Sequence, residues 1–117
     1  MEMMQAVDID APGGPEMLRL VERPKPEPAA GELLIKVTAA GVNRPDLMQR
    51  LGLYPPPPGA SDIPGLEVAG TVVALGKGVE PALLDTAVCA LVSGGGYAQY
   101  CVAAAGVCLP VPAALTM

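Results

Sequence analysis

The chain of 117 residues is close to the size of one domain, and its 51% hydrophobic content is enough for one modest core. Twelve acidic residues against seven basic ones give a formal net charge of −5, and only 16% of the residues are charged. This balance argues against nucleic acid and against an anionic membrane surface as partners.

Short apolar segments separated by Gly and Pro recur along the chain, which is typical of an all-β sandwich or barrel. Residues 4–9 and 17–21 are predicted as two strands joined by an APGGP turn. Residues 23–31 carry three prolines at alternate positions, which favours an extended loop, since each proline removes a ladder donor.

The clearest predicted strand covers residues 33–39, where apolar side chains alternate with others at a period of two. Leu33, Ile35, Val37 and Ala39 share one face, and the residues between them share the other. We therefore expect a core face and a wetter face.

One helix is predicted, over residues 43–52. Asn43 is a good N-cap, Pro45 lies in the first turn where a missing amide does no harm, and Gly52 is a C′ stop. An apolar stripe should lie against the barrel surface; it consists of Leu47, Met48 and Leu51.

The second half of the chain is predicted as a loop followed by further strands. The loop, residues 53–65, contains four consecutive prolines, which favour a stiff polyproline II path. Residues 66–75 and 86–92 are predicted as long strands, and a glycine triplet at 94–96 turns the chain into a strand at 97–103. The terminal LPVPAALTM is predicted as proline-spaced extended chain.

The sequence has no histidine, so Ser-His-Asp chemistry and histidine-based zinc sites are excluded. Three cysteines, an odd number without a CxxC pair, each lie in an apolar stretch. We expect Cys89, Cys101 and Cys108 to be buried reduced thiols, which indicates a cytoplasmic protein. The acidic amino-terminal segment does not resemble a secretory signal, and no run approaches the roughly 20 apolar residues of a membrane span.

The most distinctive motif is GLEVAGTVVALGKGV, residues 65–79, which has the spacing GxExxGxxxxxGxxV. Its spaced glycines allow positive-φ turns and close backbone approach. Glu67 is the only carboxylate in this apolar run, so we expect a buried acid paired with Arg44 or Arg50. It would form either a structural ion pair or a support for a site.

This motif, with the preceding AAGVNRPDLMQRLGLYPPPPGASDIPG, resembles the catalytic half of the medium-chain dehydrogenase/reductase superfamily. Within it the sequence is most similar to the zinc-independent quinone oxidoreductases, in particular the p53-inducible type, over essentially its whole length. The resemblance implies a mainly β, GroES-like, partly open barrel with one or two short helices. It also implies that residues 1–117 are the catalytic, substrate-side domain, without the Rossmann domain that binds NADPH.

The resemblance further implies chemistry without zinc. The zinc alcohol dehydrogenases of the superfamily hold their metal with a Cys before the helix and a His in a GHE motif, and this sequence has Asn43 and Leu66 at those positions. The implied reaction is hydride transfer from NADPH to a quinone or a related electrophilic carbonyl.

By the same resemblance, Asn43 and Tyr54 are the expected catalytic residues at the nicotinamide and substrate end of a shared cleft. Asp46, Gln49, Pro64 and Leu66 are expected to line that cleft, and Glu67 to support it. An Asn amide can donate to a quinone oxygen, and a Tyr ring can stack on a flat ligand. Both also have a purely structural alternative, as a helix cap and a loop anchor. Tyr97 and Tyr100 are interpreted as packing residues.

Two features depart from the family pattern. No glycine-rich turn between a strand and a helix is present to bind a pyrophosphate, so NADPH would be bound mainly by a domain outside these residues. Leu84 and Asp85 stand where relatives have Gly-Asp, which puts the geometry of that turn in question.

Exposed apolar surface and a homodimer are further expectations. The alternative function is a GroES-like binding or assembly module without activity, which would recruit a partner through unpaired strand edges.

Overall fold

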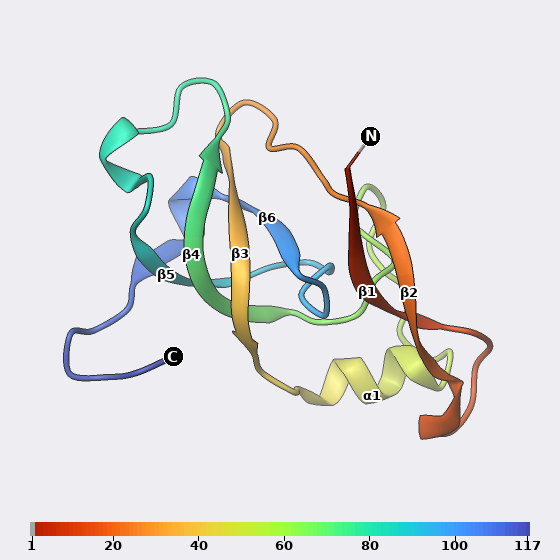
Figure 1. The fold of residues 1–117 in the computed structure, drawn as a ribbon. Coiled ribbons are helices and arrows are strands. Elements are labelled where there is room, and N and C mark those ends of the chain that lie inside the picture. Colours follow the sequence, from red (N-terminus) through yellow and green to blue (C-terminus); the bar gives the residue numbers. More distant parts are fainter. Residues whose placement is uncertain (1) are drawn as a thin grey trace.

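The computed structural model describes residues 2–117, and the strands within them form two antiparallel sheets that do not close into a barrel (Figure 1). The smaller sheet pairs β1 with β2, and the larger has the order β6-β3-β4-β5-β7. The mainly β, partly open GroES-like fold predicted from the sequence is confirmed. The elements are β1 (Met3–Ile9), β2 (Leu18–Pro24), β3 (Glu32–Ala40), α1 (Arg44–Arg50), β4 (Glu67–Leu75), β5 (Ala87–Leu91), β6 (Tyr100–Ala104) and β7 (Cys108–Pro110), with single 3₁₀ turns at 15–17, 81–83 and 105–107.

The main core is formed by apolar side chains on the strands of the larger sheet. Its buried members come from β3, β4, β5 and β6, and they are Leu33, Ile35, Val68, Val72, Val88, Ala90, Cys101 and Ala103. A second, smaller cluster joins the two sheets through Met4, Ala6 and Ile63, with Tyr97, Ala98 and Tyr100 packed against it. Burial of these side chains is the largest favourable contribution to folding.

The alternation predicted for β3 is only partly correct. Leu33 and Ile35 are fully buried, but Leu34, on the predicted wetter face, is also buried, at 3% exposure. The register with β4 then shifts between Val37 and Ala39, because Thr38 has no partner in the ladder. Such a bulge ends the strict two-residue alternation, and Ala39 is exposed.

Helix α1 begins and ends where the sequence predicts, but it packs differently. Beyond its last turn Gly52 has φ +81°, and the Gly52 and Leu53 amides donate to carbonyls of the final turn, as in a Schellman motif. The predicted apolar stripe does not lie against the sheet, since Leu47 and Leu51 are 38% and 43% exposed. The buried residue of the helix is instead Asp46.

The segment after the glycine triplet ties the two sheets together. Ala98 forms an isolated bridge with Ala6 of β1, and the Gln99 carbonyl accepts from the amide of Val37 in β3. The strand predicted at 97–103 is therefore observed only as β6, from residue 100 onward. Residues 97–99 instead form a crosslink between the two sheets. The short β7, in the segment predicted as extended chain, pairs with β5.

Two further outcomes concern the thiols and the helices. The three cysteines are free, and Cys101 is buried, but Cys89 and Cys108 are only half-buried, so the prediction of three buried thiols was wrong for two of them. Burial raises the pKa of the Cys101 thiol to about 11, with a smaller contribution from Cys108. Across residues 2–117, no helix has both the length and the apolar character needed to cross a membrane.

The turn before β5 shows how the chain accommodates Leu84. Leu84 has an ordinary extended backbone, with φ −59°, and it is Asp85 that takes the left-handed conformation, with φ +66°. The Asp85 amide donates to the Val72 carbonyl at 2.9 Å, which fixes the turn against β4.

We predict opposite effects of two substitutions at this turn. Asp85→Ala should lower the free energy of unfolding by about 1 kcal/mol, because alanine adopts the left-handed backbone conformation less readily than aspartate. Asp85→Gly should leave it equal or higher. Urea unfolding followed by circular dichroism measures both, and an alanine variant as stable as the parent would contradict the assignment of strain to this residue.

Candidate functional site

The candidate site is organised around one buried carboxylate, that of Asp46, which is 6% exposed. Its Oδ2 accepts a hydrogen bond from the backbone amide of Asn43 at 3.0 Å and one from the Tyr97 hydroxyl at 2.6 Å. Its Oδ1 accepts from the Gly65 amide at 3.2 Å. Three segments of the chain thus donate to one side chain, which satisfies a group that would be costly to bury alone.

Tyr97 is the residue of this cluster that sequence reasoning interpreted as mere packing. Its hydroxyl lies 2.6 Å from Asp46 Oδ2 and 3.1 Å from the Gly41 carbonyl oxygen. Burial is the main cause that raises the pKa of Tyr97 well above its usual range, and the hydrogen bond to Asp46 and its charge add to the effect. Tyr97 therefore remains a proton donor at neutral pH.

Gly65 closes the same cluster from the loop before β4. It has φ +105°, and a Cβ atom there would lie 2.5 Å from the backbone nitrogen of Tyr97. A side chain would separate the two segments, so the glycine allows them to approach closely. This is one of the spaced glycines in the motif that the sequence analysis singled out.

Asn43 and Glu67 form the outward-facing part of the cluster. The Asn43 Nδ2 atom donates to Glu67 Oε1 at 3.3 Å, which joins the start of α1 to the start of β4. Glu67 is exposed, and its partner is an amide, so the prediction of a buried acid paired with Arg44 or Arg50 was wrong. Arg50 donates instead to the Gly13 carbonyl at 3.1 Å.

The loop between α1 and β4 is fastened at its end. The Gln49 side chain donates to the Asp62 carbonyl at 3.0 Å, and the carboxylate of Asp62 pairs with Arg23 of β2 through contacts of 3.0 and 3.2 Å. The hydrogen bond from Arg23 is the main cause that lowers the pKa of Asp62. Since the Asp62 carboxylate is largely exposed, this pair positions the loop more than it stabilises the fold.

The remaining predicted site residues are spread around this cluster. Pro64 is buried and its carbonyl accepts from the Tyr97 amide at 2.9 Å, while half-buried Leu66 accepts from the Val92 amide at 2.8 Å. Tyr54 is 38% exposed on the loop. A common cleft shared by Tyr54 and Asn43 stays a prediction.

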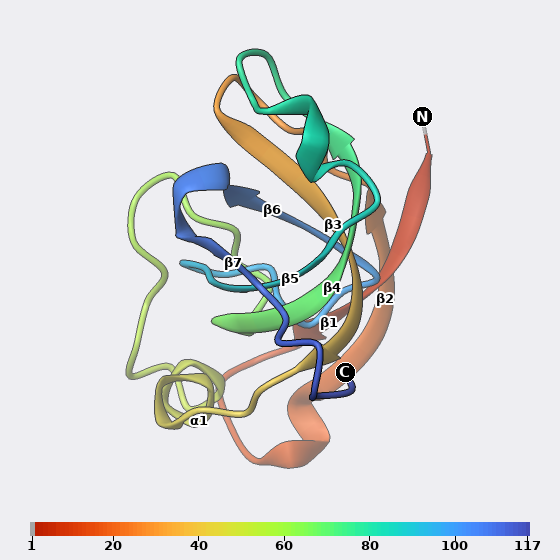
Figure 2. The same ribbon diagram turned by 90° about the vertical axis from the view of Figure 1, so that its left-hand side faces the viewer.

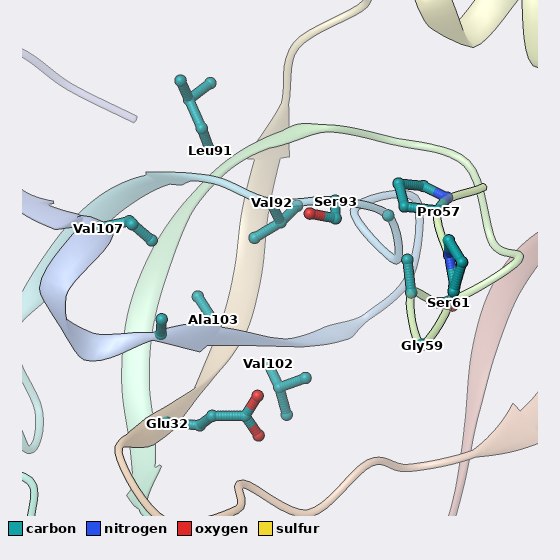
Figure 3. Close-up of a pocket in the computed structure, with 14 residues that line it drawn as sticks. Glu32, Pro57, Gly59, Ser61, Leu91, Val92, Ser93, Val102, Ala103 and Val107 are labelled. Atoms are coloured by element: carbon teal, nitrogen blue, oxygen red, sulfur yellow. The ribbon is translucent and has the colours of Figure 1, made fainter. Parts of the chain in front are cut away.

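Two concave regions lie elsewhere, and none of the predicted site residues lines either of them. The larger, of about 460 Å³, lies between the proline loop at 57–61 and the strands β5 and β6 (Figure 3). Figure 2 shows this loop rising from α1 along the side of the larger sheet. The labelled side chains that line this larger region in Figure 3 are mostly apolar, and Leu91 points away from the others. The smaller, of about 240 Å³, lies between Met4, Arg23 and Tyr100.

The glycine triplet does not offer a phosphate site. The Gly95 amide donates to the Ile63 carbonyl at 2.7 Å and the Gly96 amide to the Gly65 carbonyl at 3.0 Å, so these donors are already used. The triplet is followed by the crosslinking segment and β6 rather than by a helix. Over the described part of the chain, no group of three or more Cys, Asp or Glu side chains could hold a metal ion.

An open, mainly β fold of two sheets with one short helix is the architecture of a GroES-like domain. Residues 29–113 match the alcohol dehydrogenase GroES-like domain, and the chain belongs to this family. Its relatives include quinone oxidoreductases and VAT-1 homologs, and its structural neighbours include quinone oxidoreductases of the medium-chain superfamily, as the sequence resemblance predicted.

Three comparisons illustrate the relationship. The chain is 40% identical to the human synaptic vesicle membrane protein VAT-1 homolog-like over 108 residues, which are 92% of this chain and 24% of that protein. It is 34% identical to the rat quinone oxidoreductase over 116 residues, 97% of this chain and 35% of the relative. The structure of mycobacterial Rv1454c complexed with NADPH superimposes with a TM-score of 0.84 at 40% identity, over 97% of this chain and 35% of that one. The chain thus spans between a quarter and about a third of the length of these proteins.

The different burial of the two acids predicts different costs of removing them. Asp46→Ala should lower the free energy of unfolding by about 3 kcal/mol or more, because it leaves up to three donors without their acceptor. Glu67→Ala, at an exposed position, should cost about 0.5 kcal/mol or less. Equal losses in urea unfolding would show that Asp46 is not the centre of the cluster.

A pH titration tests the protonation of Tyr97. Its folded-state pKa is raised above the unfolded value, so the stability it contributes is complete below pH about 10 and is lost as the pH rises further. Tyrosinate ultraviolet absorbance of the native protein should show a late step that is absent in Tyr97→Phe. The Tyr100→Phe variant serves as the control and should retain the late step.

Proposed function

We propose that this chain forms the substrate-side wall of an NADPH-dependent quinone oxidoreductase that works without zinc. The observation that carries the proposal is the placement of Asn43. Its side-chain amide lies at the start of α1, where the zinc enzymes of the superfamily have a Cys ligand. This amide donates to Glu67 through a hydrogen bond of 3.3 Å, which holds it in place. The rat relative named quinone oxidoreductase and the NADPH complex of the mycobacterial neighbour support it.

Reduction of a quinone adds one hydride and one proton, and negative charge develops on the quinone oxygen as the hydride arrives. NADPH, when bound, supplies the hydride. An Asn side chain carries two N–H donors, and Glu67 occupies one of those of Asn43, which leaves the second to donate to the charged oxygen. The half-exposed ring of Tyr54 offers a flat surface on which a quinone stacks.

Binding of the NADPH pyrophosphate is assigned to residues outside this chain. The amides of Gly95 and Gly96 already donate to backbone carbonyls, and so these two donors do not fit that group. The relatives are about three to four times as long as the matched region, which leaves room for a dinucleotide-binding domain. We place the protein in the reducing cytoplasm, in keeping with its three free thiols.

A binding or assembly module without activity remains the second candidate. One feature favours it, namely a group of exposed apolar side chains on and around α1, which are Val42, Leu47, Leu51 and Leu53. These side chains would equally contact the remainder of an enzyme or a second copy in a homodimer. An activity measurement separates the two functions.

The test joins this chain to the NADPH-binding remainder of the mycobacterial relative, in place of the region it matches. We expect the fusion to oxidise NADPH with a simple ortho-quinone. Asn43→Ser, which keeps a helix cap but removes the amide, should lower kcat about a hundredfold. Tyr54→Phe should weaken quinone binding less, because the ring remains.

Two controls keep the outcome interpretable. Circular dichroism establishes that the fusion is folded, and quenching of NADPH fluorescence establishes that it binds the cofactor. A folded fusion that binds NADPH but does not oxidise it with any quinone would refute the oxidoreductase proposal and favour the binding module.

A further inference from the structure

The Tyr97 hydroxyl reaches the acidic centre of the candidate site from a segment outside the predicted site. We propose that Tyr97 and Asp46 act as a pair of positioning residues that set the orientation of the Asn43 side-chain amide toward the substrate. This inference rests on the proposed function for the role of Asn43, whereas the coupling itself is a property of this chain alone.

The coupling runs through consecutive contacts. Tyr97 donates to Asp46 Oδ2 at 2.6 Å, and the same oxygen accepts from the backbone amide of Asn43 at 3.0 Å. The backbone of Asn43 carries the side chain whose Nδ2 donates to Glu67. A change in the position of the Asp46 carboxylate therefore shifts the backbone of Asn43, and the side-chain amide moves with it.

Tyr97 is fixed at both ends, as a positioning group must be. Its amide donates to the Pro64 carbonyl at 2.9 Å, and its carbonyl accepts from the Val7 amide at 2.8 Å, so its backbone is tied to the loop and to β1. Its hydroxyl is bound to Asp46 and lies near the Gly41 carbonyl. The backbone at Asn43 is thus linked, through Asp46 and Tyr97, to β1 of the smaller sheet.

Packing alone does not explain the hydroxyl. A phenylalanine would fill the same space, but it would leave a carboxylate that is 6% exposed without its shortest hydrogen bond. Tyr100 provides a contrast three residues later, since its ring lies under the Lys25 ammonium at 4.1 Å, away from the cluster. The two tyrosines form a matched pair for substitution.

The experiment uses the chain alone and its only asparagine. Labelling with ¹⁵N-asparagine gives one backbone amide and one side-chain NH₂ group in the NMR spectrum, all from Asn43. In Tyr97→Phe we expect the side-chain NH₂ signals to shift or broaden along with the backbone signal, and in Tyr100→Phe to stay in place. Unchanged NH₂ signals in a folded Tyr97→Phe would overturn the inference.

A second variant covers the case in which Tyr97→Phe folds poorly. Asp46→Asn keeps the shape of the side chain and one acceptor oxygen but removes the charge. Because it adds a second asparagine, the Asn43→Ser/Asp46→Asn double variant identifies the new signals and separates them from those of Asn43. If Tyr97 and Asp46 act as one unit, Asp46→Asn should displace the same NH₂ signals, and adding Tyr97→Phe should displace them little further. Independent, additive shifts would contradict a single positioning unit.

The fusion enzyme separates this inference from the proposed function. Tyr97→Phe should lower kcat about tenfold with the KM for NADPH unchanged, because only the orientation of the Asn43 donor is altered. Activity equal to the parent in Tyr97→Phe would overturn the positioning role and leave the oxidoreductase proposal standing. A parent fusion that is folded and binds NADPH but has no activity would refute that proposal, and the NMR result on the chain alone would still decide the coupling.

Discussion

The carboxylate of Asp46 is the interaction on which the arrangement of the site depends. A short helix of seven residues has little stability of its own, and the apolar stripe of α1 is half-exposed, so burial of that stripe does not hold the helix in place. Asp46 fixes it instead, by accepting from the backbone amide of Asn43 just before the helix, from the end of the proline loop and from Tyr97. A buried acid is tolerated here because each donor belongs to a different segment, and together they determine a single geometry.

That arrangement explains why local sequence signals predicted the elements better than the contacts between them. Asn43, Pro45 and Gly52 act through neighbouring backbone groups, and α1 begins and ends where they indicate. Tyr97 acts on a partner 51 residues away, and nothing in its own segment distinguishes a packing tyrosine from a hydrogen-bonding one. The sequence shows only an Asp at the third position of a capped helix, and its burial, which requires donors from elsewhere, is seen only in the structure.

The interpretation of Glu67 failed for a related reason. An isolated acid in an apolar run was expected to be buried, but the residue lies at the first position of β4, where the strand has only begun to enter the sheet. The alternation in β3 failed at Leu34, which is also buried, and after Val37; the register with β4 shifts at both places, and no pattern in the sequence predicts these shifts. The general fold was predictable because turn residues and apolar periodicity recur along the chain, whereas register shifts depend on the partner strand.

The crosslinking segment at 97–99 has a consequence for how the domain acquires its site. Gln99 bonds to Gln5, 94 positions earlier, and Tyr97 accepts from the amide of Val7, so the amino-terminal hairpin is locked only after nearly the whole domain is available. Contacts of such high sequence separation form slowly, because the entropy of closing the loop is lost before they add stability. On a ribosome the helix, the loop and β4 would emerge well before Tyr97, and the acid at their junction would wait in water for its donor. The sequence separation of these contacts therefore predicts that the site becomes ordered late in folding.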